Sequence, residues 1–267
     1  PVPAGQDPAP GRSAGSVVED LFARMRAERA VAVARAHEVL DDEPVPPDSH
    51  SEDVDEALRE RRDSAVEAVQ SQLVRRLKRA LQDEQNEALD RLRAGPGPAA
   101  LATLVPPDEQ AARFRQAAPS LMDEAFLAGA RFVDPQATPA GGPGGVAAEL
   151  AAALAGPLRR ALEAALAVDD DEDDAAVVDR IGAAYRECRA MRVDRAASDA
   201  VVAAFAAGTV AVTAGKLRWV VDDDGAPCAD CEDNALADPT PVGDAFPTGQ
   251  FRPPAHAGCR CLLAPAP

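Results

Sequence analysis

This chain of 267 residues has few aromatic side chains, almost no lysine and no long apolar stretch. Aromatic residues make up 3% of the chain while hydrophobic residues make up 46%, so its apolar content is mainly alanine, valine and leucine. Such a composition favours helices over sheets. Lys78 and Lys216 are the two lysines, and arginine supplies the other basic side chains. No run of about 18 apolar residues is present, which argues against a membrane-spanning helix.

The formal net charge of -17 argues against a general nucleic-acid or anionic-membrane binder, because neutralising phosphates requires clustered cations. The first residues have neither a basic start nor an apolar stretch, so we do not identify them as a signal peptide. The number of cysteines is odd, and four of the five lie in the last 40 residues beside a histidine. This distribution favours metal binding over a secreted disulfide framework. We therefore expect the protein in the cytoplasm or in a particle assembled there.

Clusters of proline and glycine divide the chain into segments. We expect a disordered N-terminal segment (1–15), a helical body (16–134), a linker (135–145), a second helical region (146–214) and a C-terminal module (215–267). The helical body is predicted to contain helices over 16–40 and 52–93, and a third from 106 that Pro119 splits or kinks. The second region is predicted to contain helices over 146–166, with a kink at Pro157, and over 175–212.

The longest of these predicted helices, 52–93, carries an apolar stripe at steps of three and four residues. Its members are Val66, Val69, Leu73, Leu77, Leu81, Ala88 and Leu92. Stripes of this kind pack against other helices, as in coiled coils. The predicted fold class is therefore mainly α, with a body of helical hairpins that resembles a coiled coil and a small C-terminal α+β module stabilised by zinc.

The C-terminal module contains the spacing Cys228-x2-Cys231-x24-His256-x2-Cys259-x-Cys261 after a predicted strand at 217–221. Thiolate and imidazole ligands suit Zn²⁺, and four protein ligands make a closed structural site. We favour Cys228, Cys231, His256 and Cys259 as ligands, with Cys261 facing the core as the alternative ligand. Trp219, Phe246 and Phe251 are expected to form a core too small to be stable without the metal.

Other candidate residues have simpler interpretations. Cys188 lies on an apolar helical stripe and is predicted to be a buried thiol. The acidic runs 169–174 and 222–224 are predicted to be solvated. The pair of cysteines also matches half of a zinc-deaminase signature, whose other half, H-x-E, is matched literally by His50-Ser51-Glu52. A zinc enzyme of this kind would need an open coordination position and a carboxylate base, for which Glu232 and Asp233 are the nearest candidates in the sequence.

The C-terminal third resembles the phage Mu F-like minor head protein family. The resemblance lies in the strand containing Trp219, the Asp-rich turn, the Cys228-x2-Cys231 pair and the closing P-P-x-H-x-x-C-R-C from Pro253 to Cys261. The chain has Ala257 where that family usually has proline. The resemblance implies a non-catalytic structural role in head morphogenesis, with portal or capsid-like subunits, or further copies of the chain, as partners. The alternatives are a zinc-dependent enzyme, of the deaminase or hydrolase type, and a cytoplasmic coiled-coil scaffold or regulator with a domesticated phage-derived tail.

Overall fold

The computed structural model describes residues 49–94, 101–167, 174–222 and 228–266. Contacts divide the chain into two units, Pro1–Asp53 and Val54–Pro267, and the contacts discussed below all lie within the second. The predicted segments 1–15 and 16–40, residues 169–173 of the acidic run 169–174, and residues 223–224 of the acidic run 222–224 lie outside the described residues.

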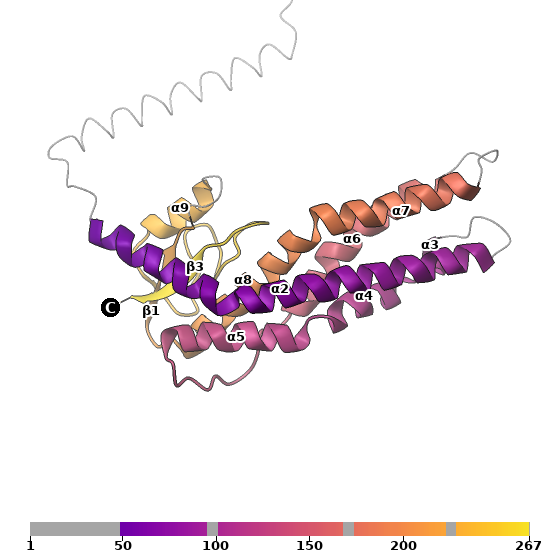
Figure 1. Ribbon diagram of the computed structural model, residues 1–267. Coiled ribbons are helices and arrows are strands. Elements are labelled where there is room, and N and C mark those ends of the chain that lie inside the picture. The colour runs from indigo at the N-terminus through magenta and orange to yellow at the C-terminus, as the bar shows by residue number, and fades with distance from the viewer. Residues whose placement is uncertain (1–48, 95–100, 168–173, 223–227, 267) are drawn as a thin grey trace, which may run out of the picture. The chain divides into compact units, whose positions relative to one another are not determined.

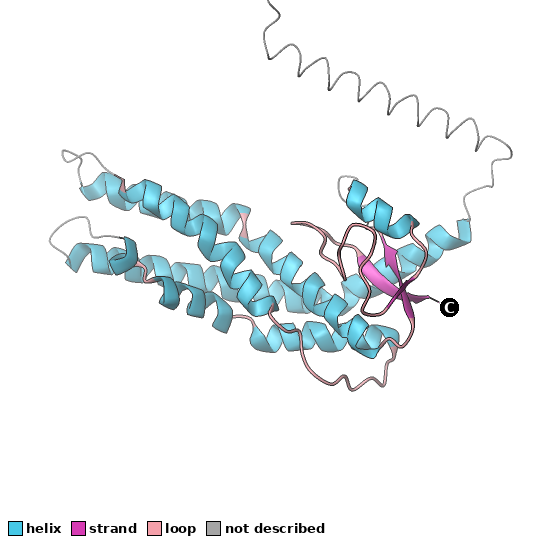
Figure 2. Ribbon diagram, turned by 180° about the vertical axis from the view of Figure 1, so that it is seen from behind, coloured by secondary structure: helices cyan, strands magenta, loops and turns pink. Residues whose placement is uncertain are grey.

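Eight helices and three strands make up the described part of the chain. The helices are α2 (Ser49–Ala94), α3 (Leu101–Leu104), α4 (Pro107–Gln116), α5 (Pro119–Val133), α6 (Val146–Leu166), α7 (Asp174–Met191), α8 (Val193–Val212) and α9 (Ala229–Leu236). The strands are β1 (Lys216–Val220), β2 (Thr240–Pro241) and β3 (Leu262–Ala266). The long helices lie side by side, and the strands and α9 gather at one end of this bundle (Figures 1 and 2). The mainly helical prediction with a small C-terminal sheet is confirmed.

Helix α2 confirms the predicted long helix and its apolar stripe. It spans 46 residues, which corresponds to about 69 Å at a rise of 1.5 Å per residue. Leu73, Leu77 and Leu81 are fully buried in the main core. Two charged residues, Arg62 and Glu84, lie on the same stripe at helical spacing, and both are buried. The stripe is therefore apolar except at two positions that need polar partners.

Prolines define the helix boundaries that the sequence predicted around Pro119. Helix α4 ends at Gln116, and Pro119 opens α5 at a position where its missing N–H has no intrahelical partner to lose. By contrast, α6 continues through Pro157 as one helix. The predicted linker 135–145 contains neither helix nor strand.

The single helix predicted over 175–212 is two helices, and this prediction is wrong. The break is at Arg192, whose φ of -119° is far from the helical value of about -63° although its ψ of -34° remains helical. No glycine or proline marks this position. After the break, α8 packs mainly along α5, whereas α7 packs along α6. Helix α8 also contacts α6.

Helices α5 and α8 touch through a reciprocal pair of glycines. A Cβ on Gly129 would lie 1.9 Å from the backbone oxygen of Phe205, and a Cβ on Gly208 would lie 1.8 Å from that of Phe126. The hydroxyl of Thr209 lies 3.2 Å from the carbonyl oxygen of Gly129, to which it donates. The two backbones are thus in direct contact, which only glycine permits at these positions.

Helix α8 is long and apolar enough to cross a membrane, and it is the one such helix in the described ranges. Most of this helix is already covered by protein, since 61% of its apolar 18-residue stretch is buried. Ala197, Val201 and Ala204 are fully buried. We therefore interpret α8 as the central core helix of the bundle.

The small sheet separates two hydrophobic cores. Strand β1 lies between β2 and β3 and pairs antiparallel with both, with Trp219 opposite Leu263. Side chains alternate between the two faces of a strand. Val220, Leu262 and Ala264 accordingly join the main helical core, whereas Trp219 and Leu263 join a second core with the cysteines. The sheet thus places the cysteine cluster on its face opposite the bundle.

Candidate metal centre

The second core is built around two aromatic side chains and three cysteines. Its buried members are Leu217, Trp219, Cys231, Phe246, Cys259, Cys261 and Leu263. The Trp219 and Phe246 rings meet edge to face, with centroids 5.1 Å apart. The expectation that Phe251 belongs to this core is wrong, because 59% of this residue is exposed. It follows a turn at 247–249 that carries it out of the core.

Two short segments bring the predicted ligands together. Cys228 occupies the N-cap position of α9 and Cys231 lies in its first turn, so a short helix that the sequence did not predict presents the first pair. His256 and Cys259 lie in the loop before β3, where the Cys259 N–H donates to the His256 carbonyl oxygen at 3.1 Å. Cys261 immediately precedes β3.

The five side chains form two overlapping groups that share Cys231. In one, the ligand atoms of Cys228, Cys231 and His256 all lie within 4.8 Å of one another. In the other, those of Cys231, Cys259 and Cys261 do so. A Cys/His cluster able to hold a metal ion is therefore present, as the sequence predicted. The exposed His256 belongs to the first group and the buried Cys261 belongs to the second.

The spacing of the sulfurs fits a tetrahedral ion. The sulfurs of Cys231 and Cys259 are 3.8 Å apart. Two thiolates bound to zinc at about 2.3 Å in a tetrahedron are separated by about 3.8 Å. The donor set of thiols and one imidazole is also the set that zinc prefers. The residues present therefore fit a structural zinc ion.

Hydrogen bonds among the buried thiols shift their pKa values in opposite directions. Hydrogen bonding from Cys261, together with that from Cys231 and backbone groups, lowers the pKa of Cys259 to about 5 despite its burial. Burial and the neighbouring Cys259 sulfur raise the pKa of Cys231 to about 12. Donation to Cys259, followed by burial, raises the pKa of Cys261. These shifts make Cys259 the most acidic thiol of the three, and a metal ion would displace the protons of the thiols that it binds.

The residues considered for a catalytic zinc site do not join this cluster. Glu232 and Asp233 are both exposed on α9, and neither belongs to the metal-binding groups found in the described residues. His50, Ser51 and Glu52 fall in the unit Pro1–Asp53, and the structure does not describe their side chains.

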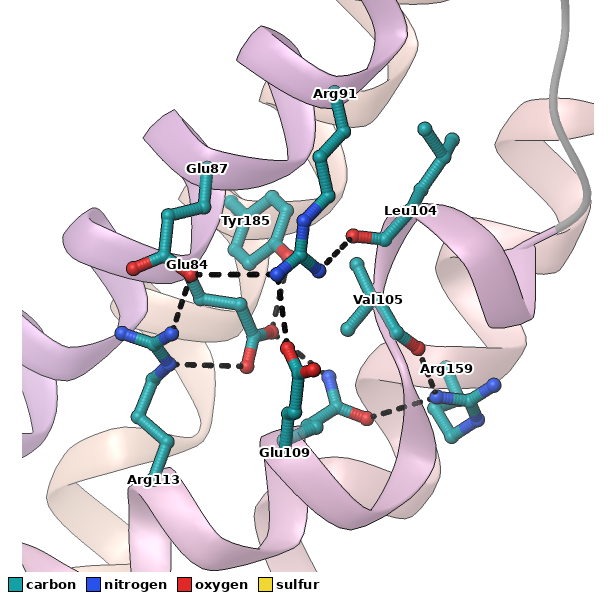
Figure 3. Close-up of polar contacts among 10 residues, drawn as sticks. Glu84, Glu87, Arg91, Leu104, Val105, Glu109, Arg113, Arg159 and Tyr185 are labelled. Carbon is teal, nitrogen blue, oxygen red and sulfur yellow. Dashed lines mark hydrogen bonds and ion pairs between the residues drawn. The ribbon is translucent and has the colours of Figure 1, made fainter.

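A second polar centre lies inside the helical bundle, around Glu84 of α2 (Figure 3). Its Oε1 accepts hydrogen bonds from the Tyr185 hydroxyl at 2.9 Å and from the Gln110 amide at 2.8 Å. Burial raises the pKa of Glu84, while these two hydrogen bonds lower it. Arg113 Nε lies 3.9 Å from Glu84 Oε2, and neither atom has a hydrogen-bond partner in the described structure.

The space beside Glu84 is too small for a substrate. Glu84, Gln110 and Arg113 line a cavity of about 10 Å³ together with residues of α2, α4 and the preceding loop. A volume of roughly 10–15 Å³ holds one water molecule. Such a water would bridge Glu84 Oε2 and Arg113 Nε, so we interpret this centre as a structural connection between α2, α4 and α7.

Sequence reasoning missed both buried charges of α2, although a signal was present. Arg62 and Glu84 interrupt the apolar stripe at positions that helical spacing assigns to the buried face. A charged residue at such a position must find a buried partner. The expectation that residues 222–224 form a solvated cluster is wrong for Asp222, because its side chain is 2% exposed and pairs with Arg62.

Comparison with protein-family models, with curated proteins and with solved structures finds no match for this chain.

Proposed function

We propose that this protein is a non-catalytic assembly protein whose helical body contacts other protein subunits and whose C-terminal module is held together by structural zinc. The kind of assembly follows from the resemblance of residues 215–267 to phage Mu F-like minor head proteins. The partners are then portal or capsid-like subunits, or further copies of the chain. The protein would act in the cytoplasm or within a phage or phage-like particle.

The observation that carries the proposal is the convergence of four cysteines and one histidine on one side of a three-stranded sheet. Each group supplies three ligands and the two groups share Cys231, so in the proposed site a ligand of the second group completes the tetrahedron in place of water. A site of this kind stabilises a fold and leaves no position for a substrate. The small second core, with its two buried aromatic rings, is the part of the molecule that such an ion would stabilise.

The zinc site is tested by metal analysis of the purified chain and of two variants. We expect one equivalent of zinc in the wild-type protein and in Cys188→Ser, which removes a buried thiol of the main core. The double variant Cys228→Ser/Cys231→Ser should lose the metal and unfold the tail while most of the helical signal in circular dichroism remains. Retention of zinc by the double variant would show that the ligands are wrongly assigned.

The non-catalytic part of the proposal is tested with cobalt in place of zinc. A closed thiolate-rich site gives a tetrahedral cobalt spectrum that does not change when azide or cyanide is added. A spectrum that shifts with these anions would reveal an exchangeable position, and would favour the zinc-enzyme alternative instead.

The assembly role is tested in the native host. A tagged chain, cross-linked in cells and purified, should carry cross-links to subunits that form a ring or shell, or to other copies of itself. A monodisperse monomer without cross-linked subunits, encoded away from any particle genes, would contradict the proposal and favour a cytoplasmic regulator.

A further inference from the structure

The N-terminal half of α2 contains a buried guanidinium. Arg62 is 2% exposed and lies one turn before Val66 on the apolar stripe. Burying an unpaired cation is very costly, so its partners decide whether this part of the fold is stable. Its Nε pairs with the adjacent Asp63 at 2.7 Å, and the rest of the guanidinium reaches the C-terminal module.

The contacts of Arg62 in that module lie far away in the sequence. Its Nη1 donates to the backbone carbonyl oxygen of Arg260, 198 residues along the chain. Its Nη2 pairs with Asp222 Oδ2 at 2.5 Å, and the Asp222 side chain is 2% exposed. Arg260 joins the same group, since its Nε lies 3.2 Å from Asp222 Oδ2 and its Nη2 lies 2.9 Å from Asp63 Oδ2.

Both partners of Arg62 in the C-terminal module adjoin candidate metal ligands. Arg260 is the residue between Cys259 and Cys261, so its carbonyl group belongs to the turn that presents both sulfurs. The backbone N–H of Asp222 donates to the thiol of Cys261. Groups that contact and orient the ligating residues alter metal affinity although they do not touch the metal.

We propose that Arg62 is a positioning residue for the metal centre, which couples metal occupancy to the docking of residues 54–66 of α2 on the C-terminal module. This inference rests on the metal site of the proposed function. When the turn at 259–261 is ordered by a metal, Arg62 keeps its buried acceptors. When the turn loosens, the guanidinium loses them and this part of α2 is released. Thermodynamic linkage makes this coupling reciprocal. The factor by which bound metal favours the Arg62 contacts is also the factor by which those contacts strengthen metal binding.

The structure provides a matched control for this coupling. Arg218 of β1 forms an ion pair with Asp55 of α2, with nitrogen–oxygen distances of 2.5 and 3.1 Å. This pair also joins α2 to the C-terminal module but does not contact the turn that bears the cysteines. A general loosening of α2 would therefore affect Arg218→Met and Arg62→Met alike, whereas positioning of the ligands affects the Arg62 variant alone.

The test measures zinc affinity of the full chain by competition with a chromophoric chelator. We expect Arg62→Met to bind zinc about 10–100-fold more weakly, the usual effect of removing a group behind a metal ligand. Arg62→Lys, which keeps the charge but loses the planar fork, should fall between this variant and the wild type. Arg218→Met should remain within about 3-fold of the wild type. The cobalt spectrum should change in the Arg62 variants and stay constant in Arg218→Met.

Hydrogen exchange provides the reciprocal measurement. Removing zinc from the wild type should increase exchange in residues 54–66, and in Arg62→Met this segment should exchange quickly with or without zinc. Equal zinc affinity in folded Arg62→Met and wild type would overturn the inference, as would equal weakening by Arg218→Met. If Arg62→Met does not fold, Arg62→Lys decides by the same criteria. A wild-type chain that binds no zinc would overturn this inference and the proposed zinc site together, whereas unchanged affinity in the variants overturns the inference alone.

Discussion

Replacing Gly208 by alanine should force α5 and α8 apart. The added Cβ would lie 1.8 Å from the backbone oxygen of Phe126, 2.8 Å from its carbonyl carbon and 2.9 Å from the backbone nitrogen of Ala130. No side-chain rotation can relieve these contacts because the atoms belong to the backbone of α5. A carbon needs about 3.5 Å or more from nonbonded atoms at its optimal separation, so the helix axes must separate by more than 1 Å.

The cost follows from what the separation breaks. The edge-to-face contact of the Phe132 and Phe205 rings, whose centroids are 5.3 Å apart, would weaken, and the hydrogen bond from Thr209 to Gly129 would break. Overpacking of a core costs about 1–3 kcal/mol when side chains can adjust, and a backbone collision belongs at or above the upper end. The better helix propensity of alanine offsets about 1 kcal/mol. We therefore expect a net loss of at least about 2 kcal/mol in the free energy of unfolding.

Urea unfolding followed by circular dichroism measures this loss, and Gly182→Ala is the matched control. At position 182 of α7, the added Cβ would meet the Nη1 of Arg186 at 3.0 Å, the far end of a flexible side chain. This variant should be as stable as the wild type, or more stable by up to about 1 kcal/mol. Gly129→Ala should lose as much stability as Gly208→Ala, and the double variant less than the sum, because the helices separate once. A Gly208→Ala variant as stable as Gly182→Ala would refute the close packing of α5 on α8.

Three further predictions concern buried titratable groups. Because burial raises the pKa of Glu84 in the folded state above its ordinary value of 4.5, its contribution to stability is complete below about pH 4.5 and is lost as the pH rises through the folded-state pKa. The unfolding free energy of the wild type minus that of Glu84→Gln should therefore fall as the pH rises above 4.5. The total fall is about 1.4 kcal/mol for each unit by which the folded-state pKa of Glu84 exceeds 4.5. A difference between the two proteins that stays constant from about pH 4 to 8 would contradict this prediction. Tyr185→Phe removes a donor 2.9 Å from Glu84 Oε1 and should cost about 1–2 kcal/mol in urea unfolding, and unchanged stability would show that this hydrogen bond is not formed. Cys188 is 3% exposed, and burial raises its pKa to about 11, so peptide mapping should find it unmodified by iodoacetamide at pH 8 until the protein is unfolded.

Local patterns in the sequence predict much of this fold because helical periodicity depends on neighbouring residues. The stripe from Val66 to Ala88 predicts α2 and its buried face, and the steps of four from Leu150 to Leu162 predict α6 in the same way. Pro119 marks the start of α5 through its fixed backbone angle. The spacing of Cys228 and Cys231 likewise predicts that their sulfurs meet, since side chains three residues apart in one helical turn lie on the same side.

Contacts between distant segments were beyond such patterns. The break at Arg192 has no glycine or proline beside it, and it accompanies the packing of α8 on α5. Gly129 and Gly208 are unremarkable in the sequence, and only the crossing of α5 and α8 makes each indispensable. Phe251 is exposed because the fold of its loop directs it away from the small core.

The sequence alone therefore determined the long helices α2 and α6, their buried faces and the residue types of the candidate metal site. Tertiary structure decided which groups meet: Glu84 with Tyr185, 101 residues away, and Arg62 with Asp222, 160 residues away. The physical reason is that a buried charge specifies only that a partner must exist. Its identity depends on which elements pack against that face of α2, and that depends on the whole fold.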